Sequence, residues 1–427
     1  MSAPVFVEPS DALPLVTVLV AFRSGSTHDA IGKEGVARLT ARMLRRGGGG
    51  RTARDIEETF DALGGEFGAD CSASATSVHF EVIRRNVDAF VDLVASLLAK
   101  PAFDVEELER LKREAAAEIV EARDSDRSLV GRAFRRTFFA GHPYGRRVAG
   151  TLASIASITR DDVAAHAARH YTRSNAVVAV SGDVTRAEGD AIAARLLAGL
   201  PEGEALADPA PEPEGKRGRH LVLVDKPDRT QTQLVVGGLG THAHDPDHVA
   251  LLVANIAFGG TFTSRLMQEV RVKRGWSYGA YARAGFDRRR DAFTMSAAPA
   301  AADAAACLAL ELELLHAFRK DGVTKDELDF VKRYVVRSHA FEVDTARKRV
   351  HQPLEAELFG LPAGYHARYL EHVEAVTVES ANAAVAKRVP EADLVIALVC
   401  TRAELGDALE KAVPDLDSVT VLPVDFE

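Results

Sequence analysis

Histidines and acidic residues gather at two places in this chain with spacings that suit a bound metal ion. His166 and His170 stand four residues apart in a predicted helix, so both imidazoles would lie on one face of it. No acid lies between them to act as a base, and we therefore expect a packing or surface role. A second segment holds three histidines and two aspartates, and we expect adventitious metal binding there at most. These residues are His242, His244, Asp245, Asp247 and His248.

Two arginines form a third group, on a helix predicted over residues 33–46. Arg38 and Arg42 are one helical turn apart and lie on a different face from the apolar stripe. That stripe consists of Val36, Leu39, Met43 and Leu44. Taken alone, the pattern is typical of an amphipathic helix whose basic face meets solvent, and Glu34 could pair with Arg38.

The elements that would position these residues are strands and helices in mixed order. A Val-rich run over residues 16–22 predicts a buried strand, and glycines 47–50 end the helix that follows it. The next predicted elements are helices over 52–63, 87–98 and 104–123 and an exposed-edge strand over 72–83. Because there is no steady β-α-β alternation, we expect an α+β fold with sheets rich in antiparallel pairing.

The sequence contains one unit twice. Glu107-Leu108 recurs as Glu327-Leu328, and Ile158-Thr159 recurs as Val376-Thr377 at almost the same offset. Two matches in the same order at nearly one offset indicate duplication of a domain of about two hundred residues. Residues 201–218 are rich in Pro, Glu, Gly and Ala and are typical of a linker. We therefore predict an N-terminal half over 1–200 and a C-terminal half over 219–427.

Composition narrows the class of partner. Of the 427 residues, 47% are hydrophobic and 27% are charged, which is ordinary for a globular protein. The formal net charge is −9 and basic residues dominate no long segment, so nucleic acid is not an expected partner. No apolar run approaches the eighteen or so residues of a membrane span, so we expect no membrane partner.

The cysteines and the N-terminus bear on the compartment. Cys71, Cys307 and Cys400 are odd in number and far apart, which argues against a disulfide framework and a thiolate metal site. We expect them to pack as small hydrophobic side chains. No secretory signal is visible. We predict a cytoplasmic protein, or a periplasmic one if a signal was removed.

From about residue 13 to the C-terminus, the chain resembles the pitrilysin/insulinase family of inverted zinc peptidases, whose fold is of the LuxS and processing-peptidase kind. In that family the first helix opens with Gly-x-Ala or Gly-x-Ser and carries H-x-x-E-H before Met-Leu. Here Gly35 opens the helix. Arg38 and Arg42 stand where the two histidines would be, and Ala41 stands where the glutamate would be. A guanidinium has donors only and alanine cannot take a proton, so the resemblance implies that this chain neither binds zinc nor activates water.

The family's third zinc ligand is a glutamate in a helix that reads Glu-Ile. It corresponds here to Glu118, followed by Ile119. Glu118 shares a helix face with Leu108, Leu111 and Ala115. We expect Arg38 and Arg42 to pair with Glu118 in place of metal ligation. The alternative is that Glu118 simply lies at the edge of its apolar stripe.

The second half carries the most specific match to the family, which has G-G shortly before S-R-L, followed by L-R-x-x-x-G-L-x-Y. The matching residues are Gly259-Gly260-Thr261-Phe262-Thr263-Ser264-Arg265-Leu266, Val270-Arg271, Gly275-Trp276 and Tyr278. The resemblance implies that Arg271 and Tyr278 hold the scissile carbonyl oxygen and stabilise the oxyanion that forms on it. Without the resemblance, we would expect Arg271 to be a surface residue at a helix end. Tyr278 would then be a core residue in a strand over 276–284. His142-Pro143-Tyr144-Gly145 matches another family loop, for which we expect a structural role.

The resemblance therefore implies the non-catalytic subunit of a bacterial two-chain peptidase, similar to the zinc-free subunit of mitochondrial processing peptidase. Such a chain has no cofactor of its own and is inactive alone, because the zinc belongs to a partner that bears H-x-x-E-H. The heterodimer would take unfolded peptide, and the chain alone could form a homodimer through the same surface. One alternative is a structural or assembly protein of the same fold, like the zinc-free relatives in respiratory complexes. Another is an independent enzyme that uses the histidines, which lacks any identifiable base.

Overall fold

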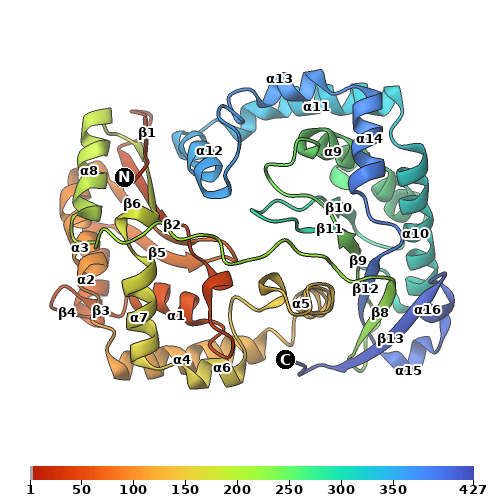
Figure 1. The fold of residues 1–427 in the computed structure, drawn as a ribbon, viewed down its shortest axis with the longest axis horizontal. Helices are drawn as coiled ribbons and strands as arrows, with labels where there is room; N and C mark the ends of the chain where they lie inside the picture. The colour runs from red at the N-terminus through yellow and green to blue at the C-terminus, as the bar shows by residue number, and fades with distance from the viewer. Residues whose placement is uncertain (1–2) are drawn as a thin grey trace. The chain divides into compact units, whose positions relative to one another are not determined.

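The computed structural model describes residues 3–427, which form two compact units, each built around one mixed β-sheet (Figure 1). The first unit takes in the chain up to residue 119 together with 146–210 and 340–366. The second takes in 120–145, 211–339 and 367–427. Each unit therefore contains a segment from the other half of the sequence.

The sheet of the first unit has five strands in the order β1-β7-β2-β6-β5. Only β1 and β7 pair in parallel, and the other neighbours are antiparallel. The strands are β1 (Val5–Pro9), β2 (Leu15–Phe22), β5 (Gly65–Cys71), β6 (Thr76–Ile83) and β7 (Ala176–Gly182). A separate two-stranded ribbon joins β3 (Gly47–Gly48) to β4 (Arg51–Thr52).

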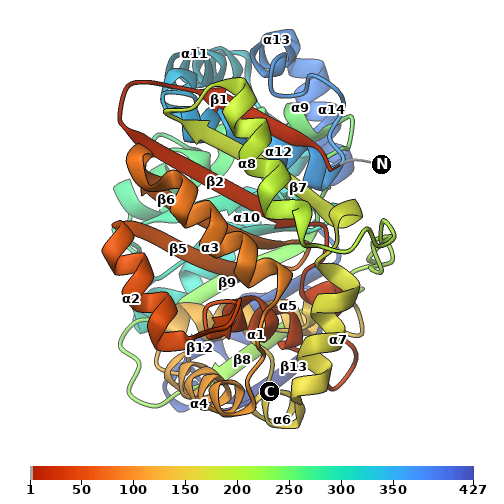
Figure 2. The same ribbon diagram turned by 90° about the vertical axis from the view of Figure 1, so that its left-hand side faces the viewer.

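Helices cover both faces of this sheet, and the strand side chains alternate accordingly. Along β2, Val16, Val18 and Val20 enter the main core, whereas Ala21 packs on the opposite side. The main core is completed by the helices of the first part of the chain, of which α3 and α8 lie across the sheet in Figure 2. These helices are α1 (Val36–Met43), α2 (Ala53–Leu63), α3 (Val87–Ala99), α4 (Val105–Glu121), α6 (Leu152–Ser157), α7 (Arg160–His170) and α8 (Arg186–Ala198).

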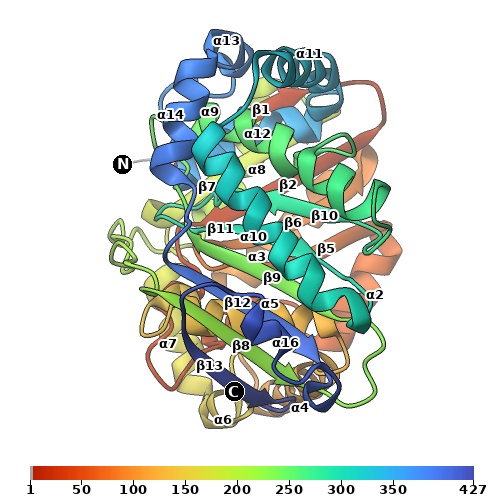
Figure 3. The ribbon, with the colours of Figure 1, turned by 90° about the vertical axis from the view of Figure 1, so that its right-hand side faces the viewer.

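The sheet of the second unit has six strands in the order β10-β11-β9-β12-β8-β13. Its strands are β8 (Arg219–Asp225), β9 (Gln233–Leu239), β10 (Ala280–Arg283), β11 (Ala292–Ala297), β12 (Leu394–Cys400) and β13 (Leu416–Pro423). One face packs against α10, which crosses it in Figure 3, and against the other helices of this half. These are α9 (His248–Asn255), α10 (Ala304–Asp321), α11 (Lys325–Glu342), α13 (Tyr369–Ala375), α14 (Val378–Arg388), α15 (Arg402–Leu405) and α16 (Ala408–Lys411).

The two sheets repeat one topology. The order β1-β7-β2-β6-β5 of the first sheet recurs in the second as β8-β12-β9-β11-β10, with β13 added beyond β8. The sequence matches fall on equivalent helices, since Thr159 and Thr377 are both N-caps with a capping box, at the starts of α7 and α14. The predicted α+β fold of two similar halves with antiparallel-rich sheets is confirmed.

One helix of each half is exchanged. α5 (Asp126–Phe138) belongs to the second unit and packs on β12, β9 and β8, whereas α12 (Ala346–Phe359) belongs to the first unit and packs on β7 and β1. The starts of the two helices are separated by the same offset as Glu107 and Glu327 of the sequence repeat. Each therefore covers the second face of a sheet formed by the other half of the chain.

Two further expectations from the composition concern the three cysteines and a membrane span. Cys71, Cys307 and Cys400 are free and buried, as expected of small core side chains. Within residues 3–427, no helix has the length and apolarity that a bilayer crossing requires.

Candidate functional site

The first helix is fixed at its start by a buried carboxylate. Asp29 accepts hydrogen bonds from the backbone N–H of Gly35 at 2.7 Å and of Ala37 at 3.0 Å, where a helix has no internal acceptors. Gly35 has φ of 99°, and a Cβ there would lie 2.8 Å from Cδ1 of Ile155. Burial raises the pKa of Asp29 to about 7, although the two backbone hydrogen bonds lower it. This cap sets the direction in which α1 presents its polar face.

Arg38 and Arg42 converge on one carboxylate of α4. Arg38 Nη2 donates to Glu118 Oε2 at 2.9 Å, and Arg42 Nη1 donates to the same oxygen at 3.1 Å. Arg42 Nη2 lies 2.9 Å from the other oxygen, Oε1. The expected pairing of both arginines with Glu118 is therefore present. Ala41, on the same helix, is fully buried.

The charges of this cluster decide the protonation of Glu118. Burial alone would raise the pKa of this carboxyl, but the hydrogen bonds and charges of Arg42 and Arg38 outweigh it and hold the pKa below its ordinary value. Glu118 is thus an anion fully engaged by two cations. The side chains are 26% exposed for Arg38, 23% for Arg42 and 40% for Glu118, so the cluster is in contact with solvent.

These residues do not fit a zinc ion. Zinc needs lone pairs from imidazole, thiolate or carboxylate, and the two guanidinium groups offer only N–H donors and a positive charge. Glu118 is the one ligand type present, and both of its oxygens accept from arginine. Among residues 3–427 there is no group of three or more His, Cys, Asp or Glu side chains arranged to hold a metal ion.

The cluster is larger than the sequence predicted, because it continues along α4 and takes in Arg46, which follows the end of α1. Arg46 Nη2 donates to Glu114 Oε2 at 2.6 Å, and its Nη1 lies 3.5 Å from a carboxylate oxygen of Glu107. Glu107, Glu114 and Glu118 follow one another at helical spacings of seven and four, which places them on one face of α4. The sequence could have revealed this through the helical spacing of the three glutamates. These glutamates form an acidic stripe on α4 that faces the arginines of the cluster.

The second candidate region is the segment that leads into β10. Arg265 anchors its start, since Nε and Nη2 each donate to a different carboxylate oxygen of Glu327 at 2.6 Å. The chain then widens into a π-helical turn over Met267–Val272, in which Lys273 N–H donates to Gln268 O at 2.9 Å. Such turns occur frequently at functional sites. The turn carries Arg271 outward, and Gly275 closes it with φ of 67°.

Tyr278 lies in the loop before β10 and not within the strand, which begins only at Ala280. The hydroxyl of Ser277 holds this loop, because Oγ donates to Gly279 O at 2.7 Å and accepts from Ala298 N–H at 2.9 Å. The expectation of a strand over residues 276–284 is therefore too long by several residues. The bond pattern of Ser277 replaces strand pairing there and turns Tyr278 to the surface.

Arg271 and Tyr278 lie close together. The guanidinium carbon of Arg271 lies 4.4 Å from the ring centroid of Tyr278 and 4.8 Å from that of Phe262. Tyr278 is 83% exposed. Within residues 3–427 neither side chain has a hydrogen bond or an ion pair, so the N–H groups of Arg271 and the hydroxyl of Tyr278 are open to a ligand.

The histidines of the first pair pack against each other in the first unit. The ring centroids of His166 and His170 lie 4.2 Å apart, and both side chains are buried. Burial lowers the pKa of His170 to about 4 and lowers that of His166 well below its ordinary value. Both rings are therefore neutral packing groups at neutral pH, in line with the expected packing role.

The carboxylates of the second histidine segment are already paired with cations. Asp245 lies 2.6 Å from Nη2 of Arg388, and Asp247 lies 2.6 Å from Nζ of Lys387. His248 is buried, and burial lowers its pKa to about 4. His142, in the other matched loop, accepts from Tyr144 N–H at 3.1 Å through Nδ1, which fits the expected structural role.

Comparison with known proteins places this geometry in one family. A model described as insulinase (peptidase family M16) matches residues 5–152, and a model described as the peptidase M16 inactive domain matches residues 157–335. Between them the two models cover the greater part of the chain, and the second runs from the end of the first repeat into the second repeat.

Two relatives illustrate the range within the family. An uncharacterized zinc protease of Mycobacterium leprae is 29% identical over 363 residues, which cover 84% of this chain and 81% of that protein. The non-peptidase homolog YmxG of Helicobacter pylori is 23% identical over 401 residues, which cover 93% and 92%.

Solved structures give the same assignment. A crystal structure of a peptidase M16 inactive domain from Pseudomonas fluorescens has a TM-score of 0.87 at 28% identity and covers 93% of this chain and 95% of that one. A chain of complex III2 from Candida albicans has a TM-score of 0.77 at 18% identity over 96% of both chains, which shows a shared fold. With both repeats matched by family models and the whole architecture shared, the chain belongs to the M16 (insulinase) family of peptidases.

Proposed function

We propose that this chain is the non-catalytic subunit of a two-chain zinc peptidase, and that Arg271 and Tyr278 complete the active site of a partner bearing H-x-x-E-H. The observation that supports this most is the open state of the two side chains. The Arg271 guanidinium lies over two aromatic rings and Tyr278 is largely exposed, and neither side chain has a hydrogen bond or ion pair to any residue in 3–427. A purely structural role does not require an arginine and a tyrosine held in this way.

The chemistry follows from the donors that these residues offer. The Tyr278 hydroxyl and the Arg271 N–H groups can donate to the carbonyl oxygen of a bound peptide, and these bonds strengthen as negative charge develops on that oxygen. The π-helical turn and the Ser277 hydrogen bonds hold the two donors near each other before substrate arrives. This chain thereby supplies orientation and charge stabilisation, while the zinc and the general base belong to the partner.

The arginine cluster of α1 supports an inactive chain. Arg38 and Arg42 stand at the positions of the two metal-binding histidines, and both pair with the carboxylate that would be the third ligand. We infer that the chain cleaves no peptide alone and needs no metal for its own stability. The Helicobacter pylori relative, a non-peptidase homolog, agrees with an inactive member of this kind.

The test is a cleavage assay on the assembled pair. The chain is co-expressed with an H-x-x-E-H member of the family from the same genome, and turnover of an unstructured peptide is measured after co-purification. We expect Tyr278→Phe to lower turnover by about a hundredfold or more while the two chains still co-purify. Tyr334→Phe, an exposed tyrosine on α11, is the matched control and should leave turnover unchanged. Equal turnover of Tyr278→Phe and the unmodified pair would remove the proposed role.

A structural or assembly protein of the same fold is the second candidate, and the likeness to a chain of complex III2 favours it. It predicts a stable complex with a partner chain that shows no peptidase activity at all. The same co-purification distinguishes the two, because a complex that forms but never cleaves peptide supports the structural role. A homodimer of this chain, without any partner, would also lack activity.

A further inference from the structure

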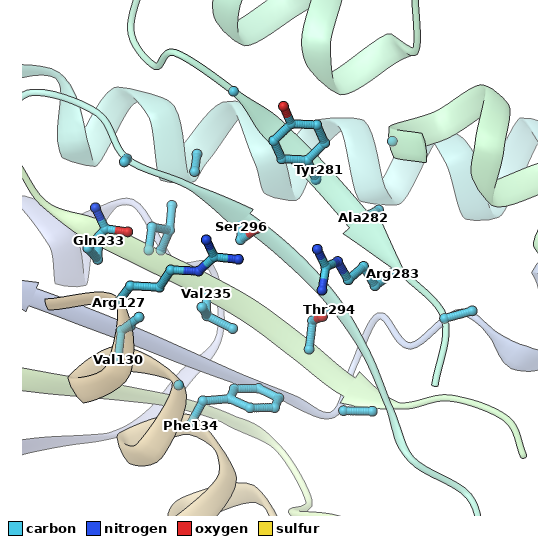
Figure 4. A pocket seen from close by; sticks show the side chains of 18 of the residues that line it. Arg127, Val130, Phe134, Gln233, Val235, Tyr281, Ala282, Arg283, Thr294 and Ser296 are labelled. Atoms are coloured by element: carbon cyan, nitrogen blue, oxygen red, sulfur yellow. The ribbon is translucent and has the colours of Figure 1, made fainter. Parts of the chain in front are cut away.

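A groove of about 1100 Å³ lies in the second unit, between α5 and the face of the sheet that α5 covers (Figure 4). It exceeds the volume of about 300–1,000 Å³ that is typical of small-molecule sites. Tyr278 and the backbone of Gly279 form part of its lining, and it extends from there along β10, β11 and β9 to α5. The groove therefore begins at the proposed carbonyl-binding residue and continues past it.

Polar side chains line part of the groove, because every second side chain of a strand faces the same side of the sheet. On β11, Thr294 and Ser296 line the groove, whereas Phe293 and Met295 face the core on the other side. Pairing between the strands sets Arg283 beside Thr294. Two residues along a strand span about 6.7 Å, so the two hydroxyls repeat at the spacing of alternate residues in an extended peptide.

The charge of the groove is positive. Arg135 is paired with Asp291 at 3.0 Å, and Asp291 is the one acidic side chain in the described lining. Arg127 on α5 and Arg283 on β10 are both exposed and have no ion pair or hydrogen bond within residues 3–427. Figure 4 shows both side chains reaching over the floor from opposite sides. Two uncompensated guanidinium groups above hydroxyls and an amide favour carboxylates.

The equivalent groove of the first unit differs from this one in size and charge. There α12 takes the place of α5, and the space is about 450 Å³. Arg347 occupies the position on α12 that Arg127 has on α5, and it lies 3.9 Å from Glu81. His351 fills the position equivalent to Gly131, and Glu355 that of Arg135. The first groove is thus smaller and carries acids and bases together, whereas the second is larger and basic.

We propose that the groove of the second unit binds an extended, acidic segment of the peptide substrate, with Arg127 and Arg283 selecting carboxylate side chains. This inference rests on the proposed function, since it assigns the bound peptide to the substrate that Tyr278 holds. It gives the chain a second task, which is to choose among peptides by charge. Arg127 and Arg283 are specificity-determining residues and take no part in bond cleavage.

The test measures binding to the chain alone, so neither a partner nor zinc is needed. Two labelled, unstructured ten-residue peptides are compared by fluorescence anisotropy, one with two glutamates and one with glutamines in their place. We expect the glutamate peptide to bind about tenfold more tightly at low salt, as two partly exposed ion pairs provide, and the preference to shrink as salt is added. The double variant Arg127→Gln/Arg283→Gln should bind both peptides alike.

Arg347→Gln is the matched control, because it removes the arginine at the equivalent position of the other groove and should keep the preference. Unchanged thermal unfolding of each variant verifies that it is folded. Equal binding of both peptides by the unmodified chain, a preference that persists in the double variant, or no binding of either peptide at millimolar concentration would each overturn the proposal. The proposed function fails separately: if Tyr278→Phe leaves turnover of the pair unchanged while the glutamate preference holds, the groove binds acidic peptide that is not a substrate.

Discussion

The arginine cluster of the first unit and the Arg271 region of the second unit use charged side chains in opposite ways. In the first unit, Arg38 and Arg42 share Glu118, and each cation is answered by a carboxylate at hydrogen-bond distance. In the second unit, the Arg271 guanidinium lies over two aromatic rings without an ion pair, and a carboxyl on α10, Glu311, is buried without any hydrogen-bond partner within residues 3–427. A charge that is already paired contributes stability, whereas an unpaired one is available to a ligand or responds to pH.

Restoring metal ligands to α1 is the change with the largest expected effect. The triple variant Arg38→His/Ala41→Glu/Arg42→His places two imidazoles one turn apart beside Glu118, which is freed from both arginines. We expect one equivalent of Zn²⁺ to bind with a Kd of about 1 μM or below, on the order of 8 kcal/mol, where the unmodified chain binds none tightly. Calorimetric titration measures it.

Its control is the same triple variant with Glu118→Gln, which should bind zinc far more weakly. Failure of the triple variant to bind zinc would mean that Arg38 and Arg42 do not occupy the positions of metal ligands. Loss of a metal site would then not explain why Arg38 and Arg42 are paired whereas Arg271 is not.

The variant Arg271→Lys tests the role of the arginine that has no ion pair. A lysine keeps the charge but loses the planar array of donors, so we expect turnover of the assembled pair to fall by about tenfold to a hundredfold. Arg274→Lys is the matched control, because Arg274 is paired with Glu269 at 2.7 Å and should affect turnover little. Peptide cleavage by the co-purified pair is the measurement, and equal losses for both variants would contradict a special role for Arg271.

Glu311 should make the chain less stable as pH rises. Burial raises its pKa to about 8, so the folded state keeps a proton that the unfolded state releases above about pH 4.5. The free energy of unfolding should therefore fall by about 1.4 kcal/mol for each pH unit between pH 5 and 8, and level off above that. Glu311→Gln should remove this slope, as measured by urea unfolding at several pH values, whereas Glu313→Gln, exposed on the same helix, should keep it.

Glu118 should show the opposite dependence and a smaller effect. Because its pKa is lowered in the folded state, the stability it contributes is present above its ordinary pKa and is lost as pH falls through the folded value. Glu118→Gln should lower the free energy of unfolding by about 1–2 kcal/mol at pH 7, since two half-buried guanidinium groups lose their partner. Below about pH 4 the difference from the unmodified chain should shrink. Glu121→Gln, exposed at the end of α4, is the control, and an equal loss there would contradict the pairing.

Local signals were sufficient for much of the fold. The valines of β2 form the expected buried strand, and the repeated Thr159 and Thr377 fall at the starts of equivalent helices, α7 and α14. The pairing of Arg38 and Arg42 with Glu118 could also be anticipated, because family positions bring the two helices together. Glu114 and Arg46 were missed, although the helical spacing of Glu107, Glu114 and Glu118 could have revealed them.

Other features depend on tertiary packing and leave no local mark. The alternation over 72–83 is typical of an exposed edge, yet β6 lies inside the sheet because β5 pairs with it. The late start of β10, after the Tyr278 loop, depends on Ser277 and Ala298, which are far apart in sequence. The groove is lined from α5, β9, β10 and β11 together, so no stretch of sequence carries its shape or charge.

The reciprocal exchange of α5 and α12 has a consequence for proteolysis. A protease that cuts the segment joining the two repeats, near Pro211, would sever the chain without separating it, because each fragment still holds a helix that covers the other fragment's sheet. Nicked protein should then migrate as intact material on a sizing column and as two bands only after denaturation. For the same reason, neither repeat expressed by itself would have a complete hydrophobic core.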